Sequence, residues 1–197
     1  MKTVVIASNN AHKAREIAEA LDFPGWEFRT LRELGIESDP AEDADTFEGN
    51  ARIKAQAARE ASGGRAVLAD DSGLEVDALG GAPGVFSARY AGDPCDDAAN
   101  NAKLLAELAD VPDEGRTARF VCTLAFIDED GAETVARGTV EGRIGHEGRG
   151  SHGFGYDPLF LPDVFDGVRT LAEALPEEKN AVSHRGNALR ELRAKLA

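Results

Sequence analysis

The sequence predicts an α/β fold, because strand-like apolar runs alternate with segments of helical periodicity. Lys2 to Ala7 (KTVVIA) is a β-rich run that leads into a helical pattern. Val67 to Ala69 is a short buried strand that ends on polar residues. Two further β runs, Arg119 to Ile127 and Glu133 to Ile144, are joined by a DEDG turn and predict a hairpin.

We expect one domain that covers residues 1–197, since the chain is 42% hydrophobic and no Pro/Ser-rich linker or charge block divides it. The N-terminus, MKTVVIASNN, has too few apolar residues for a signal peptide, and no stretch is long enough to cross a bilayer. We therefore expect a soluble, cytoplasmic protein without membrane partners. Cys95 and Cys122 are far apart and belong to no metal-ligand spacing, so neither a disulfide framework nor a structural zinc site is predicted.

The formal net charge of −14 argues against a broad nucleic-acid-binding surface, which needs basic patches that release counterions. A small anionic ligand is compatible with this charge if a local positive pocket or a divalent cation offsets the field of the protein. The few lysines and histidines near motifs are therefore expected to matter more than usual for ligand binding.

The first loop, Ser8-Asn9-Asn10, separates the first strand from a helix with Ala14 and Ile17 on one face. Asparagine caps helices well, so an ordinary N-cap is one interpretation of this loop. Lys13 favours another interpretation, because a lysine in the first turn opposes the helix dipole unless an anion lies there. A helix N-terminus with an ammonium group beside it is suited to phosphate.

An acidic loop, Glu37 to Asp45, precedes a predicted helix from Thr46 to Ser62 that ends at two glycines. Most of its carboxylates are expected on the surface, but Glu42 lies close enough to the helix to reach a metal ion. Lys54, within the helix, is compatible with an ordinary surface charge.

The central stretch, ADDSG, is expected to break from strand into turn at Asp70, Asp71, Ser72 and Gly73. Ligand groups in open α/β sheets lie at such strand ends. Successive strand side chains point to opposite faces, so one aspartate should face the site and the other should brace the turn. A plain turn without function is the alternative.

The second half contains an amphipathic helix, Asp96 to Ala109, and a glycine-rich loop that ends in GFGYDPLF (Gly153 to Phe160). Flexible backbone beside aromatic residues suits a flat ring ligand, although an anchored surface loop is equally compatible. Thr170 to Leu175 should open a short helix with a Thr170 to Glu173 capping box, closed by a proline. The final segment, Glu177 to Leu196, combines a leucine-rich helical face with a cluster of basic residues.

Five separated motifs occur in an order that resembles the inosine triphosphate pyrophosphatase family, the noncanonical purine nucleoside triphosphate pyrophosphatases. They are SNNAHK, TFEGNARIKA, ADDSGLEVDALGGAPGVFSARYAG, GFGYDPLF and SHRGNAL. Each short motif is unspecific, but DDSGLEVDAL together with PGVFSARYAG is highly characteristic, and the resemblance spans nearly the whole chain.

The resemblance implies a mixed α/β fold with an elongated central sheet, flanking helices and two lobes around a substrate cleft. It implies a homodimer and Mg²⁺-dependent hydrolysis of ITP, dITP and XTP to the monophosphate and pyrophosphate. Glu42 and Asp71 would hold Mg²⁺, and Asp71 would also be the catalytic base. The implied substrate-binding residues are Ser8, Asn9, Asn10, Ala11, His12, Lys13, Ser72, Phe154, Gly155, Tyr156, Asp157, Lys179, His184 and Arg185.

Two positions depart from the family pattern. The family has Glu-Thr-Gly where this chain has Glu42-Asp43-Ala44, and Glu-Asn-Ala where it has Gly49-Asn50-Ala51. Glu48 is one residue early, about 100° around a helix, which is a poor position from which to replace the missing carboxylate.

Two other functions are compatible with parts of the sequence. A phosphatase of the haloacid dehalogenase type needs Asp-x-Asp, which the Asp70-Asp71-Ser72 run does not provide. A noncatalytic nucleotide sensor of the same fold is the remaining alternative.

Overall fold

The computed structural model describes residues 2–20, 23 and 25–196, without the side chains of residues 11, 12, 15, 19 and 20. The strands form a six-stranded sheet in the order β2-β1-β3-β4-β5-β6, in which β1 pairs in parallel with β2 and β3, and β5 pairs antiparallel with β6. The strands are β1 (Lys2–Ala7), β2 (Trp26–Thr30), β3 (Ala66–Val76), β4 (Thr117–Ile127), β5 (Glu133–Ile144) and β6 (Phe160–Pro162). The α-helices are α1 (Ala11–Ala20), α2 (Phe47–Ala61), α3 (Asp97–Glu107), α4 (Pro176–Val182) and α5 (His184–Leu196).

The chain divides into two compact units. The first unit comprises Met1–Asp71, Cys122–Gly138 and Arg185–Ala197, and the second comprises Ser72–Val121 and Thr139–His184. Strands β3, β4 and β5 each contribute residues to both. The expectation of a single domain stays a prediction.

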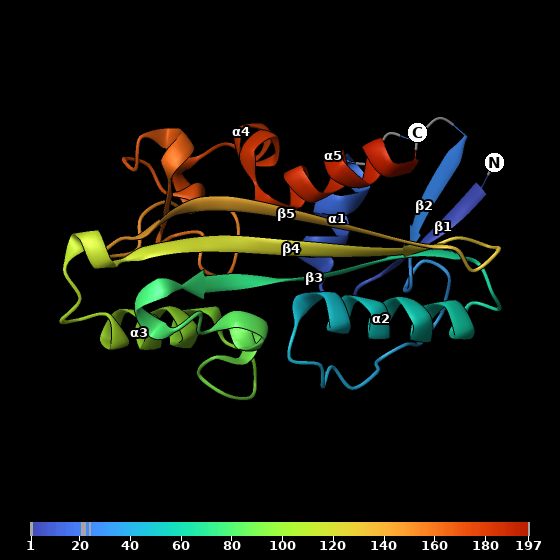
Figure 1. Cartoon of the computed structure of the whole chain (residues 1–197), viewed down its shortest axis with the longest axis horizontal. Helices are drawn as coiled ribbons and strands as arrows, with labels where there is room; N and C mark the ends of the chain where they lie inside the picture. The colour runs from blue at the N-terminus through green and yellow to red at the C-terminus, as the bar shows by residue number, and fades with distance from the viewer. Residues whose placement is uncertain (1, 21–22, 24, 197) are drawn as a thin grey trace. The chain divides into compact units, whose positions relative to one another are not determined.

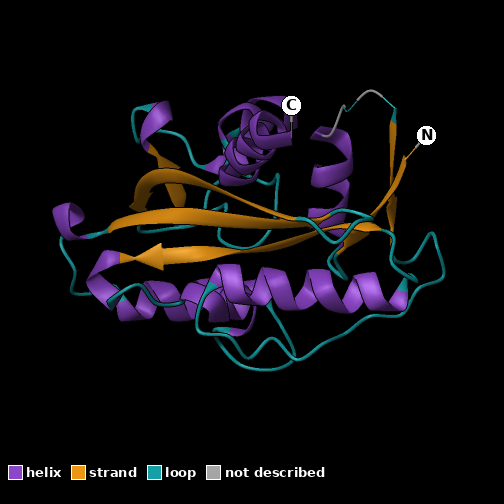
Figure 2. Ribbon diagram, turned by 45° about the vertical axis from the view of Figure 1, so that its right-hand side comes forward, coloured by secondary structure: helices purple, strands orange, loops and turns teal. Residues whose placement is uncertain are grey.

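In the first unit, the alternation of strand side chains builds two apolar layers. Val4 and Ile6 of β1 pack with α1 and α5, whereas Val5 and Ala7 pack with three alanines of α2. Figures 1 and 2 accordingly show α2 on one side of these strands and α1 and α5 on the other. Because alanine is small, α2 lies close to the sheet, which brings its partly buried Lys54 near Asp71 of β3.

In the second unit, the core contains the second half of β3 and the first half of β4. These strand segments pack with α3 and with the segment around β6. Leu74, Leu104, Phe120 and Phe160 belong to one buried cluster, and the rings of Phe120 and Phe160 lie 4.8 Å apart. Arg116 is also buried and donates to the carbonyls of Leu108, Ile144 and Gly145 at 2.6–2.8 Å. This guanidinium binds the carbonyl of Leu108, the C-cap residue of α3, and joins the helix to the end of β5.

Most predicted elements are confirmed. The first strand has the predicted bounds, the hairpin strands are neighbours in the sheet, and Thr46 caps α2 by accepting from the Gly49 N–H at 3.1 Å. Asp96 likewise caps α3, with its Oδ1 accepting from the N–H groups of Ala98 and Ala99.

The predicted break at Asp70 is wrong. Strand β3 continues from Ala66 through the aspartates to Val76. Ionised side chains are tolerated in mid-strand here because Asp70 and Asp71 each have cationic partners. The predicted helix at Thr170 to Leu175 is a shorter 3₁₀ turn, Leu171–Glu173, in which the Glu173 carboxylate accepts from the Thr170 N–H.

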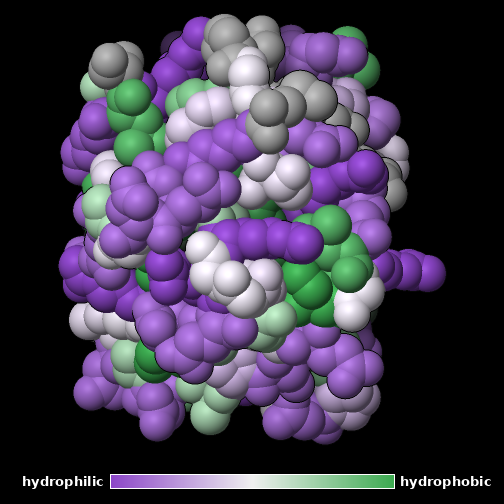
Figure 3. Space-filling model, turned by 90° about the vertical axis from the view of Figure 1, so that its right-hand side faces the viewer, coloured by the Kyte–Doolittle hydropathy of each residue, from purple (hydrophilic) through white to green (hydrophobic). Residues whose placement is uncertain are grey.

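Pro176 does not close that turn as expected but begins α4, where proline is favoured because its missing N–H has no helical acceptor. Among the described residues, no helix is both long and apolar enough to cross a bilayer. The face drawn in Figure 3 is dominated by hydrophilic side chains, with hydrophobic ones in small separate patches.

Candidate functional site

Glu42, Lys54 and Asp71 form a cluster in the first unit, which we call the carboxylate cluster. The Lys54 Nζ lies 2.7 Å from Asp71 Oδ1 and 2.8 Å from Glu42 Oε2. The side chain of Lys54 is 14% exposed and that of Asp71 is 9% exposed. The interpretation of Lys54 as an ordinary surface charge is therefore wrong: the helix directs it inward, between the two carboxylates expected to hold a metal ion.

The pKa values of this cluster reflect burial and mutual charge. Burial raises the pKa of Asp71, and the nearby charges of Lys54 and Lys13 offset this only in part, so the pKa stays above its ordinary value. Burial also disfavours the Lys54 ammonium, but Asp71 and Glu42 outweigh that effect and raise the pKa of Lys54. Within the described part of the chain, Asp71 Oδ2 is buried and has no hydrogen-bond partner. It can therefore accept a proton or bind a cation.

Asp70, on the opposite face of β3, organises a second charged group. Its Oδ1 lies 2.9 Å from the Lys13 Nζ, and its Oδ2 accepts from Arg185 Nε at 3.1 Å and from Cys122 Sγ at 2.9 Å. Arg185 also pairs with Glu16. The anion that the position of Lys13 requires is thus present in the chain itself, as the carboxylate of Asp70.

This second group is strongly buried. The Asp70 side chain is fully buried and that of Arg185 is 2% exposed. Burial disfavours the charged guanidinium, but the Asp70 charge more than compensates, so the pKa of Arg185 is raised. Burial and the adjacent Asp70 charge also raise the pKa of the Cys122 thiol, which stays protonated as a donor.

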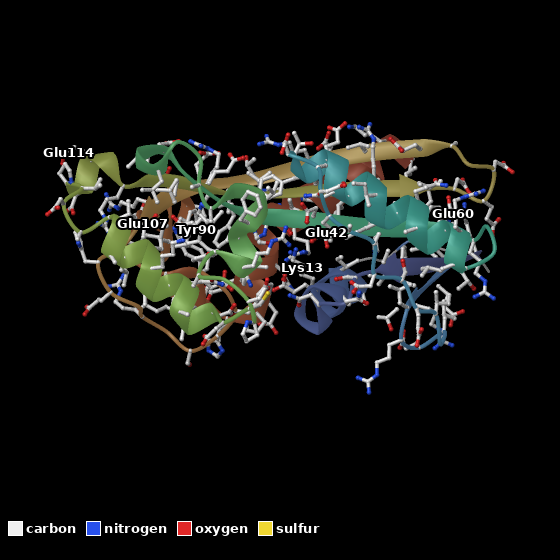
Figure 4. The ribbon with its side chains drawn as sticks, turned by 90° about the horizontal axis from the view of Figure 1, so that it is seen from below. Lys13, Glu42, Glu60, Tyr90, Glu107 and Glu114 are labelled. Carbon is white, nitrogen blue, oxygen red and sulfur yellow. The ribbon has the colours of Figure 1, made fainter. Side chains whose placement is uncertain are left out.

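The loop before α1 provides an ordinary N-cap, which was one of the two interpretations of Ser8-Asn9-Asn10. Asn10 Oδ1 accepts from the Lys13 N–H at 3.1 Å, and the Asn9 side chain donates to the Ser38 carbonyl at 3.0 Å. Ala11 and His12 lie in the first turn of α1, and their side chains are outside the described part. Figure 4 labels Lys13 at the start of this helix and Glu42 in the loop that precedes α2.

The two departures from the family pattern meet in space. A Cβ placed on Gly49 would lie 2.5 Å from the Cβ of Ala44, so only one of these positions has room for a side chain. Asn50 holds the same loop, since its Oδ1 accepts from the Ala44 N–H at 3.0 Å. Glu48 is exposed and pairs with Arg52 on the surface of α2, so it does not join the carboxylate cluster.

In the second unit, residues 153–157 form a loop that we call the base loop. The Lys179 Nζ lies 2.8 Å from Asp157 Oδ2, which also accepts from the Phe154 N–H at 2.9 Å. The ammonium lies 4.8 Å from the centre of the Phe154 ring. Asp157 and Lys179 are both buried, so the structure brings together three of the residues predicted to bind substrate.

The other residues of the second unit that were predicted to bind substrate have separate surroundings. His184 is buried and its ring stacks on Phe120, with centroids 4.8 Å apart. The Tyr156 hydroxyl donates to the Ser87 carbonyl at 2.8 Å, and burial raises the pKa of Tyr156. Ser72 is half-buried in β3.

Two residues beside the base loop were not singled out from the sequence. Asp97 and Asn101 of α3 both bond to the backbone of Gly155. Their spacing of four residues places them on one helix face, which is a visible signal. It does not reveal the partner, which lies more than fifty residues away along the chain.

The predicted residues fall into separate groups by unit. Those of the first unit are Ser8, Asn9, Asn10, Ala11, His12, Lys13, Glu42, Asp71 and Arg185. Those of the second unit are Ser72, Phe154, Gly155, Tyr156, Asp157, Lys179 and His184.

Comparison with known proteins gives matches along almost the entire chain. A model of the Ham1 family matches residues 4–195. A dITP/XTP pyrophosphatase from Leifsonia xyli is 51% identical over 191 residues, which cover 95% of this chain and 92% of that protein. Another, from Exiguobacterium sibiricum, is 49% identical over 193 residues, covering 98% and 96%.

Solved structures agree with these matches. A HAM1 protein from Coxiella burnetii is 42% identical with a TM-score of 0.88, over 100% of this chain and 98% of that one. A nucleoside-triphosphatase / dITP/XTP pyrophosphatase from Mycobacterium abscessus is 46% identical with a TM-score of 0.78, over 98% of both chains. The mixed α/β fold and the family resemblance predicted from the five motifs are thereby confirmed. This chain belongs to the Ham1 family.

Proposed function

We propose that this protein hydrolyses noncanonical purine nucleoside triphosphates, dITP, XTP and ITP, to the nucleoside monophosphate and pyrophosphate. Relatives that are about half identical over nearly their whole length are dITP/XTP pyrophosphatases. The single observation that carries the proposal is the carboxylate cluster, in which a buried aspartate with a raised pKa lies against a lysine. Perturbed, buried ionisable groups of this kind are typical of catalytic sites.

The residues of the cluster fit a magnesium ion. Mg²⁺ is usually held by one or two carboxylates together with waters and substrate phosphates, and Glu42 and Asp71 supply such a pair. The buried Asp71 Oδ2, which has no partner in the described chain, is a suitable ligand atom. Among the described residues, no group of three or more aspartate, glutamate, histidine or cysteine side chains is placed to hold a metal ion, so a magnesium site here would be completed by water and substrate phosphate. When bound, the ion would neutralise phosphate charge and orient the attacking water.

Asp71 is proposed as the general base. A carboxylate whose pKa is raised accepts a proton more readily than an ordinary aspartate at the same pH. The water oxygen bonds to the α-phosphorus, its proton passes to Asp71, and the bond from the α-phosphorus to the bridging oxygen breaks, releasing pyrophosphate. Lys13, at the positive end of α1, and Lys54 would stabilise the negative charge on the phosphates.

Base recognition is proposed to involve Phe154 and His184. The Phe154 ring would stack on the purine, and His184 would donate to the O6 atom of a 6-oxo purine. Adenine presents a donor where these bases present O6, so ATP would leave buried polar groups unpaired, which can discriminate strongly. Guanine shares O6 and N1–H, so we expect weaker discrimination against GTP.

Arg185 was also predicted to contact the base, and this stays a prediction. The pairing of its guanidinium with Asp70 and Glu16 favours a structural contribution. Three further parts of the proposal have separate grounds. The family resemblance supports a homodimer, the composition of the N-terminus supports a cytoplasmic location, and the net charge of −14 argues against nucleic-acid partners.

The decisive experiment measures pyrophosphate release over a panel of dITP, XTP, ITP, GTP and ATP, with and without Mg²⁺. We expect rapid, Mg²⁺-dependent release from the first three and little from ATP. Asp71→Asn should abolish turnover while the folded protein still binds XTP. Binding without any turnover in the unmodified protein would favour a nucleotide sensor, and near-normal turnover by Asp71→Asn would remove Asp71 as the base.

A further inference from the structure

Two side chains of helix α3 form hydrogen bonds with both backbone polar groups of Gly155 in the base loop. Asp97 Oδ2 accepts from the Gly155 N–H at 2.7 Å, and Asn101 Nδ2 donates to the Gly155 carbonyl at 2.9 Å. We call this pair of contacts the Gly155 clamp. Because Asp97 and Asn101 are one helical turn apart, a rigid element fixes both polar groups of a loop residue at once.

The clamp acts on the residue that sets the direction of Phe154. Gly155 has a φ of +61°, a left-handed conformation that favours glycine. Its neighbour Phe154 is bonded through its N–H to Asp157, and Tyr156 on the other side is anchored by its hydroxyl. A change in the Gly155 backbone would therefore turn the Phe154 ring relative to a loop that is otherwise held in place.

Helix capping does not account for these two side chains. Asp96, not Asp97, caps α3 by bonding the free N–H groups of its first turn. The Asn101 Oδ1 is buried and, as far as the chain is described, has no hydrogen-bond partner. An unsatisfied buried acceptor is unfavourable, and a leucine would avoid it at similar volume. The amide at position 101 is explained by its bond to Gly155 rather than by packing.

We propose that Asp97 and Asn101 are positioning residues that set purine specificity by holding the base loop in its binding conformation. They act through Gly155 on Phe154 and do not themselves touch the base. The inference rests on the proposed function, in which Phe154 stacks on the purine. Because Phe154 would hold the plane of the purine while His184 meets O6, a misplaced Phe154 should lower the XTP to ATP ratio of kcat/KM. Helix α3 thereby joins the elements that determine which nucleotide is accepted.

The physical reason is preorganisation. A loop that is ordered before the ligand arrives does not lose conformational freedom on binding, so its affinity for the base is higher. Releasing the clamp should weaken binding of the base portion and leave the binding of phosphate unchanged. In kinetic terms, KM for XTP should rise while kcat at saturation stays near normal.

The test compares Asp97→Ala, Asn101→Leu and the double variant with Asp96→Ala. The last variant is a matched control, since it weakens the same end of α3 without a bond to Gly155. We measure the dissociation constants of xanthosine monophosphate and of inorganic tripolyphosphate, amide hydrogen exchange at residues 153–157, and the XTP to ATP ratio of kcat/KM.

We expect the double variant to bind xanthosine monophosphate about tenfold more weakly, which corresponds to about 1.4 kcal/mol. Its tripolyphosphate affinity should stay within about twofold of the unmodified protein, and exchange at the base loop should accelerate. Asn101→Leu alone should lower base affinity without lowering the melting temperature. Asp96→Ala should lower the melting temperature and leave the XTP to ATP ratio unchanged.

Three results would overturn the proposal that Asp97 and Asn101 position the base loop. In the first, xanthosine monophosphate and tripolyphosphate affinities fall together with the melting temperature, which indicates a merely structural role. In the second, loop exchange and base selectivity are unchanged in the double variant. In the third, the unmodified protein does not bind xanthosine monophosphate. If it binds but hydrolyses no nucleotide, the proposed function fails, while exchange and binding still decide on the clamp.

Discussion

Replacing Lys54 with methionine tests the carboxylate cluster most directly. Methionine keeps most of the length and apolar stem of lysine but removes the ammonium between Asp71 and Glu42. Each of these ion pairs, at 2.7 and 2.8 Å, is worth about 6 kcal/mol in gross attraction at an effective dielectric constant of about 20. The cost of burying the charges offsets most of that attraction.

The net loss is therefore smaller than the gross attraction. Removing one partner of a buried pair costs about 3–5 kcal/mol, because a charge is left without compensation. Since the Glu42 side chain is 36% exposed, we expect a value near the lower end, about 3 kcal/mol of unfolding free energy. Urea unfolding of both proteins in the absence of Mg²⁺ measures this difference.

The loss of unfolding free energy in Lys54→Met should depend on pH. The Lys54 charge lowers the pKa of Asp71, so its removal raises that pKa further. A carboxyl group with a raised folded-state pKa stabilises the fold below its unfolded pKa, about 3.9, and this stabilisation disappears as the pH rises through the folded value. Lys54→Met should thus be destabilised less near pH 4 than at neutral pH.

Two controls make the result specific. Arg52→Met removes a positive charge from the same helix, but its side chain is 47% exposed and its ion pairs are superficial, so it should cost less than about 1 kcal/mol. Adding Mg²⁺ should restore part of the stability of Lys54→Met, about 1.4 kcal/mol at ten times the dissociation constant. If Lys54→Met unfolds like Arg52→Met, with the same pH dependence and unchanged kcat/KM for XTP, the electrostatic account of the cluster is refuted.

Other substitutions probe the neighbouring groups. Gly49→Ala should destabilise the protein by about 1–3 kcal/mol through overpacking, and Ala44→Gly should remove most of that cost, as a thermal-denaturation double-mutant cycle would reveal. Arg185→Ala should lower the unfolding free energy by about 3 kcal/mol, because the buried Asp70 loses one cationic partner and keeps Lys13, while the ITP to ATP ratio of kcat/KM changes little. A selective loss of ITP hydrolysis would return Arg185 to base recognition. Lys13→Ala should weaken tripolyphosphate binding measured by calorimetry, and unchanged affinity would show that Lys13 serves only to compensate Asp70.

Much of the fold could be predicted because it rests on local patterns. The first strand, the capped helices α2 and α3 and the hairpin follow from apolar periodicity and end signals that lie within a few residues of each other. The break predicted at Asp70 failed because carboxylates in mid-strand are disfavoured by local rules. Their cations come from α1, α2 and α5, far along the chain, and no local pattern contains them.

The candidate site divides in the same way. Asp71 and Glu42 were candidates from the sequence pattern and received their roles from the motif resemblance, whereas Lys54 resembles any other helical lysine in the sequence and is distinguished only by its partners. The proposed positioning role of Asp97 and Asn101 rests on their hydrogen bonds to Gly155, in a loop more than fifty residues away along the chain. Residue type and spacing thus suggested which side chains carry chemistry, whereas the residues that hold them in place emerged from tertiary contacts.

The close approach of Ala44 and Gly49 also constrains how such a pair of residues can change over time. In a chain with glycine at position 44 and glutamate at position 49, gaining the alanine methyl first would cost about 1–3 kcal/mol, because the two Cβ atoms would be too close. Losing the glutamate first avoids this cost, and restoring the glutamate incurs it unless the alanine reverts beforehand. The methyl group of Ala44 therefore disfavours the return of a side chain at position 49 by a single substitution.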